Sequence, residues 1–145
     1  MSDHFRIIGR IARAYARLAD AQLRPLGLAT AQLPVLVTLK SGAALAQSDL
    51  AREAQVEQPS MAQLLARMER DGLVARTPHP EDRRSQHVSL TPAARRLLPR
   101  AKALLDAQTA QALSTLSAAE VAQLLSLLQR VGTAMDALVS AGDRD

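Results

Sequence analysis

The chain has 145 residues and no cysteine, so it has no disulfides, no thiolate zinc sites and no thiol-based redox sensing. Its 48% hydrophobic content supports one domain with a real core, and an aromatic content of only 1% means that this core consists of aliphatic side chains and Met, which favours helices. The formal net charge of +4 is unevenly spread: residues 52–102 hold ten basic and six acidic side chains, whereas residues 103–145 hold two and five.

No membrane or secretory signal is recognisable. No run approaches the roughly 18 apolar residues that a bilayer span needs, and the N-terminus has an early acid and scattered arginines where a signal peptide would be apolar. We therefore expect a cytoplasmic protein with no membrane partner.

A first helix is predicted from residue 5 to about residue 23, where apolar side chains recur at helical spacing. Pro25 and Gly27 end it. The arginines on its other faces are most simply solvated charges.

Thr30 is expected to cap a second helix that runs to about Lys40, with Pro34 tolerated in its first turn. Gly42 closes this helix. Residues 43–46 are then expected to place one strand of a small sheet.

Two short helices around a tight turn are predicted next, over residues 47–54 and 58–72. Ser48 is expected to cap the first, and Asp49 lies near the positive end of its dipole. In the second, Pro59 suits the first turn and Gly72 supplies the left-handed stop.

The 58–72 helix has two distinct faces. Four apolar side chains at i, i+3, i+4 and i+7 form a stripe toward the core: Met61, Leu64, Leu65 and Met68. The opposite face carries side chains that reach phosphates and base edges: Ser60, Gln63, Arg67 and Arg70. An ordinary solvated face is the alternative for this helix taken alone.

A basic hairpin follows. Residues 73–77 and 87–90 have strand character, and the polar link 78–86 carries Arg83 and Arg84 at its tip. A basic hairpin tip suits a phosphate backbone or a narrow minor groove, which favours double-stranded DNA as the partner.

Long helices are predicted after the hairpin. Thr91 caps one that runs from residue 93 to about 116, broken or kinked near Pro99, and Ser117 with Glu120 forms a capping box for the last. A winged helix needs only residues 28–92, and exposing apolar faces in 1–27 and 93–145 would cost about 25 cal/mol per Å². We therefore expect both ends to intertwine with a second copy as a homodimer.

Catalytic and metal sites are not expected. The histidines His4, His79 and His87 lack ligand spacing, Glu81 and Asp82 are adjacent and point different ways, and no Gly-rich phosphate loop exists. We expect no enzyme activity, no metal and no cofactor.

Residues 47–51, 58–74 and 79–92 resemble the MarR family of bacterial transcription regulators. The most specific element is Asp82-Arg83-Arg84 followed by a strand and Leu90-Thr91-Pro92. One departure is Gln55, where family members often have Gly, so Gln55 is expected to need a left-handed backbone.

This resemblance implies a mainly α fold with a small β-hairpin wing: a winged helix-turn-helix over 28–92 between dimerisation helices at 1–27 and 93–145. The expected DNA-binding residues are Gln58, Pro59, Ser60, Gln63, Arg67, Arg70, Asp82, Arg83 and Arg84. A repressor released from a pseudo-palindromic operator by a small anionic or phenolic effector is implied, with Arg13 and Tyr15 as candidate pocket residues. The alternative is a protein-contact module, or an architectural DNA binder without an effector.

Overall fold

The chain begins with a long amphipathic helix, α1 (Asp3–Leu23), in a computed structural model that describes residues 2–79, 81–82 and 86–143. The Ser2 hydroxyl accepts a hydrogen bond from the His4 N–H at 3.3 Å and caps the helix. Only its last turns are buried, at Ala19 and Leu23. The turn η1 (Arg24–Leu26) and Gly27, with φ of 73°, end it as predicted.

The second helical segment starts differently from the prediction. Thr30 is not a cap; it lies inside the 3₁₀ turn η2 (Thr30–Gln32), which leads into α2 (Leu33–Leu39). Its backbone N–H donates to Asp20 Oδ1 at 2.7 Å, a contact from ten residues upstream that local sequence does not reveal. Pro34 lies in the first turn of α2, as expected.

The helix-turn-helix consists of α3 (Gln47–Glu53) and α4 (Gln58–Arg70), preceded by the short strand β1 (Leu45–Ala46). The prediction that Ser48 caps α3 is wrong. Ala46 is the N-cap, because strand β1 holds it extended and runs directly into the helix. Gln55 in the turn has φ of 55°, which confirms the left-handed backbone expected there.

Helix α4 presents its predicted apolar stripe to the core. Met61, Leu65 and Met68 are fully buried and Leu64 nearly so. Pro59 lies in the first turn, and Gly72, with φ of 73°, follows the last. The helix is therefore fixed by its inner face and leaves its outer face to solvent.

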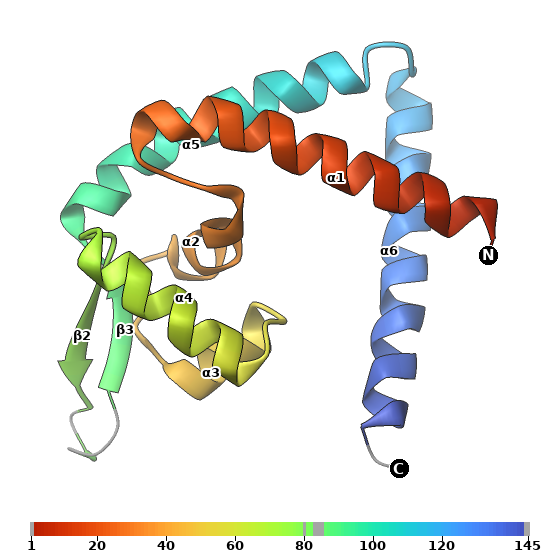
Figure 1. The fold of residues 1–145 in the computed structure, drawn as a ribbon. Helices are drawn as coiled ribbons and strands as arrows, with labels where there is room; N and C mark the ends of the chain where they lie inside the picture. Colours follow the sequence, from red (N-terminus) through yellow and green to blue (C-terminus); the bar gives the residue numbers. More distant parts are fainter. Residues whose placement is uncertain (1, 80, 83–85, 144–145) are drawn as a thin grey trace. The chain divides into compact units, whose positions relative to one another are not determined.

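The wing is a hairpin of β2 (Val74–Pro78) and β3 (Gln86–Leu90), beside α3 and α4 in Figure 1. It belongs to an antiparallel sheet in the order β1-β3-β2, with Leu45 opposite Val88 and Val74 opposite Leu90. Thr91 closes the root of the hairpin. Its hydroxyl donates to the Gly72 carbonyl oxygen at 2.6 Å and accepts from the Ala94 N–H at 3.2 Å, and the second contact is the predicted cap.

Helix α5 (Pro92–Ala112) is continuous through Pro99, so the predicted alternative of a break is wrong and that of a kink stays a prediction. The chain divides into two units, Met1–Asp106 and Ala107–Asp145. The second contains α6 (Ala118–Gly142), whose predicted capping box is confirmed: the Ser117 N–H donates to Glu120 Oε2 at 2.8 Å and the Glu120 N–H to Ser117 Oγ at 3.2 Å. No residue of α6 is buried in the single chain.

The core of the first unit joins the helices to the sheet. Its largest fully buried side chains are Leu23, Leu36, Leu39, Leu50, Met61, Leu65 and Met68. The predicted fold class is confirmed as mainly α, with a winged helix-turn-helix. Within the described residues, no helix is long and apolar enough to cross a membrane.

Candidate nucleic-acid interface

The outer face of α4 gathers the predicted contact residues. All six are exposed: Gln58, Pro59, Ser60, Gln63, Arg67 and Arg70. Because Pro59, Gln63 and Arg70 are separated by four and seven residues, they follow one side of the helix, opposite the buried stripe. Gln58 lies at the flank, and its Oε1 accepts from Gln47 Nε2 at 3.4 Å.

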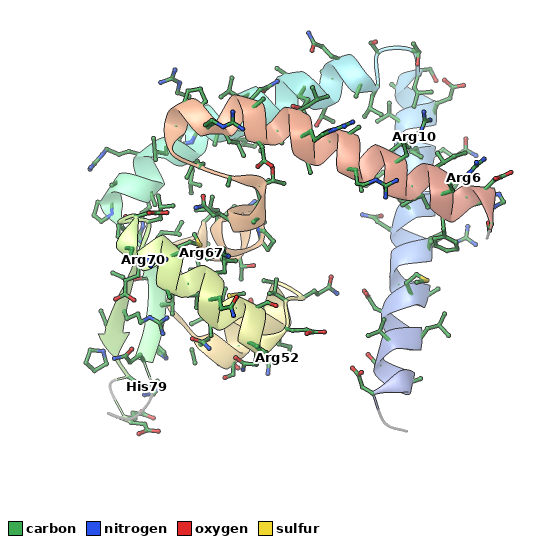
Figure 2. All side chains as sticks on the ribbon, in the orientation of Figure 1. Arg6, Arg10, Arg52, Arg67, Arg70 and His79 are labelled. Atoms are coloured by element: carbon green, nitrogen blue, oxygen red, sulfur yellow. The ribbon has the colours of Figure 1, made fainter. Side chains whose placement is uncertain are left out.

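The C-terminal half of this face is hollowed. An open depression of about 490 Å³ is lined by Gln63, Ala66, Arg67, Glu69 and Arg70. Figure 2 shows Arg67 and Arg70 on α4 and Arg52 near the end of α3. The small Ala66 between longer polar side chains leaves room for a group that enters from outside.

The cations of this face are available for a ligand. Among the residues that the structure describes, neither Arg67 nor Arg70 forms an ion pair. Arg52, which sequence reasoning did not select, donates from Nη2 to Asp49 Oδ1 at 2.9 Å and remains mostly exposed. Guanidinium groups held on a helix surface suit bidentate contact with phosphate or guanine.

The wing can be described only in part. Asp82 is exposed, and its backbone N–H and that of Glu81 both donate to His79 Nδ1, at 3.2 and 3.0 Å. The His79 ring meets the edge of the His87 ring, with centroids 4.4 Å apart. Arg83 and Arg84 lie outside the described residues, so their predicted role stays a prediction.

Arg76 in β2 is a residue that sequence reasoning missed. Its Nε donates to Glu69 Oε2 at 3.0 Å and its Nη1 to Gln47 Oε1 at 3.4 Å. It shares a strand face with the buried Val74, two residues away. A cation at an inward position of a period-two strand was the signal that could have identified it.

The two candidate effector residues do not come together on α1. Arg13 and Tyr15 are both exposed, and residues two apart on a helix are about 200° apart around its axis. Their side chains therefore leave the helix on nearly opposite sides. Among the described residues, no group of three His, Asp or Glu side chains is placed to hold a metal ion.

Known proteins share this architecture. The sequence model of the MarR family matches residues 26–85. A probable transcriptional regulator from Pseudomonas aeruginosa is 31% identical, with a TM-score of 0.71, and the match covers 86% of this chain and 96% of that one. A point mutant of MarR from E. coli, solved with operator DNA, is 28% identical with a TM-score of 0.80, over 87% of this chain and 91% of that one.

A MarR-family regulator from Listeria monocytogenes, described as putative and solved with a 26mer DNA, shares the fold. It is 23% identical, with a TM-score of 0.83, over 93% of this chain and 90% of that one. The winged helix-turn-helix and these matches define a transcription regulator fold. The chain belongs to the MarR family.

Proposed function

We propose that this protein is a cytoplasmic, homodimeric repressor that binds a pseudo-palindromic operator in double-stranded DNA. In this proposal α4 enters the major groove and the wing contacts the flanking minor groove. The observation that carries it is the outer face of α4, where Ser60, Gln63, Arg67 and Arg70 are exposed while Met61, Leu65 and Met68 on the inner face are fully buried. MarR from E. coli, which is similar over most of its length, has been solved with operator DNA.

The roles follow from chemistry. Gln63 and Ser60 are assigned to base edges in the major groove, where every base pair is distinguishable, and Arg67 to a phosphate. Gln58 and Pro59, exposed at the start of α4, are assigned to the same DNA-binding surface, and Arg70 to a further phosphate contact. Asp82, Arg83 and Arg84 are assigned to the wing contact.

The proposed dimer accounts for the apolar face of α6. Eight of its large apolar side chains are 37–68% exposed in the single chain, from Leu124 at 37% to Leu138 at 68%. At about 25 cal/mol per Å², such a face favours association. In this proposal residues 1–27 and 93–145 form the dimer, and residues 28–92 bind DNA.

The proposal includes release of DNA by a small anionic or phenolic effector that changes the spacing of the two DNA-binding segments. Family membership supports this part, and Arg13 and Tyr15 remain its candidate residues. Because they leave α1 on nearly opposite sides, we assign them to two separate contacts.

Selection of bound sequences from random double-stranded DNA tests the function. A two-fold motif with half-sites about 10 base pairs apart, or a multiple of that, is the expected result. Affinity for the selected sequence is expected to fall steeply with salt, as counterions are released. An asymmetric footprint that covers only one half-site, with affinity that depends little on salt, would contradict the proposal.

A further inference from the structure

Arg76 occupies an unusual place for a cation. It is the third residue of β2, and its side chain is only 23% exposed. The cations of the other described ion pairs, Arg6, Arg52 and Lys102, are 68–74% exposed and bond to acids three or four residues away on their own helices. The Arg76 pair instead joins a strand to a different element.

The contacts of Arg76 form a chain that returns to the same helix. Arg76 bonds Glu69 near the end of α4 and Gln47 at the start of α3, and Gln47 bonds Gln58 at the start of α4. Gln58 and Glu69 are eleven residues apart, so they lie on one side of α4, about 16 Å apart along its axis. This series of hydrogen bonds, Glu69–Arg76–Gln47–Gln58, therefore supports three turns of α4 along one side, and we call it the brace.

The brace lies beside the outer face that we assign to DNA, about a quarter-turn away. Glu69 belongs both to the brace, where it accepts a hydrogen bond from Arg76, and to the depression on the outer face, where it lies near Arg67 and Arg70. Rotation of α4 about its axis would move Gln63 and Arg67 and would break the bonds at both ends of the flank. A contact group needs such support, because a misplacement of about 1 Å is enough to lose its effect.

We propose that Arg76 is a positioning residue for operator recognition, which fixes the rotation of α4 against strand β2 without touching DNA itself. This rests on the proposed function. Its Nε and Nη1 are already engaged within the protein, which argues against a phosphate contact as its main role.

The test compares full-length variants on the selected operator and on a random duplex over a range of salt. Arg76→Met keeps the length of the side chain and removes its charge; Glu69→Gln weakens the same pair more mildly. Both are expected to lower operator affinity, Arg76→Met by about tenfold, with random-duplex affinity and salt slope nearly unchanged. The reciprocal variant Glu69→Arg/Arg76→Glu is expected to recover most of the loss.

Lys102→Met is the matched control, because it also removes one cation and one ion pair, here with Asp106 on α5. It is expected to leave the operator-to-random ratio unchanged. If Arg76→Met weakens both duplexes equally and reduces the salt slope by about one, Arg76 is a phosphate contact and the positioning role is wrong.

The remaining outcomes are also distinct. No recovery in the reciprocal variant, or wild-type affinity in Arg76→Met and Glu69→Gln, overturns the positioning role while the proposed function stands. Absence of salt-dependent DNA binding by the wild-type protein overturns both. If Arg76→Met fails to fold, as judged by its thermal unfolding curve, Glu69→Gln and the reciprocal variant decide.

Discussion

The Thr30 N–H donates to Asp20 Oδ1 at 2.7 Å and so ties the end of α1 to η2. The Thr30 hydroxyl lies within reach of the same carboxylate and of the Ala16 carbonyl oxygen, 3.2 Å away, and can turn its proton to either. The hydroxyl lowers the pKa of Asp20 most, the Thr30 N–H lowers it further, and the charge of Arg24 acts in the same direction. These bonds favour the ionised carboxylate in the folded state.

A pH dependence follows from that direction. Because the folded pKa of Asp20 is below its ordinary value of 3.8, its contribution to stability is complete above that value and is lost as pH falls through the folded pKa. Asp20→Asn keeps an oxygen acceptor for Thr30 but does not titrate. The difference in unfolding free energy between wild type and variant, from denaturant titrations, is expected to be larger at pH 7 than at pH 3; a constant difference would contradict the prediction.

Gly72 allows a second stability test. Its φ of 73° strains any L side chain, although no atom beyond Gly72 and its two chain neighbours lies within 4 Å of the position of an added Cβ. Gly72→Ala is therefore expected to cost about 1–2 kcal/mol from the backbone alone. Asp71→Ala is the matched control, because Asp71 is the exposed neighbour and has a right-handed backbone with φ of −80°; it is expected to change stability by less than about 0.5 kcal/mol. Unfolding curves at one fixed protein concentration measure both variants, and an equal loss of stability in the two would refute the argument.

The apolar face of α6 is expected to hold the dimer. Leu128 and Met135, seven residues apart, are both exposed in the single chain. Leu128→Asp/Met135→Asp is expected to give a monomer by light scattering after gel filtration, because charges cannot be buried unpaired at low cost. Ser126→Asp/Thr133→Asp has the same spacing on the opposite side of α6 and should leave the dimer intact. A dimer that persists in the first variant would exclude this face.

Gln63 and Arg67 are expected to act differently on DNA although both project from the outer face of α4. Gln63→Ala should relax preference at one operator position, at a cost of about 1–3 kcal/mol. Arg67→Ala should weaken all sequences alike and reduce the salt slope by about one. Binding to a panel of single-base operator changes measures both effects. Equal weakening of every sequence by Gln63→Ala would show that the two roles are assigned wrongly.

The wing tip is expected to supply affinity and shape preference. Arg84→Ala should weaken all operators together, since the minor groove distinguishes little beyond A·T from G·C, and Asp82→Ala should do so more mildly. Glu81→Ala, which removes a neighbouring acid, is the control and should not lower affinity. Intact affinity in Arg84→Ala, measured on the same operator panel, would exclude Arg84 from the contact.

Features that depend on residues close together in the sequence were predicted better than features that depend on distant residues. The apolar stripe of α4 and the Ser117–Glu120 capping box depend on residues a few positions apart, and both were predicted correctly. The left-handed Gln55 was also predicted correctly, from the resemblance to a family that often has Gly at this position. Thr30 was assigned wrongly as a cap because its backbone N–H is bonded by Asp20 of the preceding helix.

Contacts between residues far apart in the sequence were the hardest to predict from the sequence. Ser48 was assigned wrongly as a cap because pairing of Ala46 with His87 across the sheet sets the start of α3. The bond between Gln47 and Arg76 joins positions 29 apart, and only the folded arrangement brings them together. The outer face of α4 was predictable as a set of residues, whereas the brace along its flank was not.

The closure of the hairpin root by Thr91 bears on how such a chain can diversify. The Thr91 hydroxyl bonds both the Gly72 carbonyl, just before the wing, and the first turn of α5, just after it. The two ends of the wing segment are therefore held together. Lengthening a loop whose ends are already held together costs little, about 0.6 kcal/mol for each doubling. Insertions or charge changes beyond the paired strands therefore need not disturb the core. Under the proposed function, descendants of this chain can vary the DNA contacts of the wing while the helix-turn-helix stays intact.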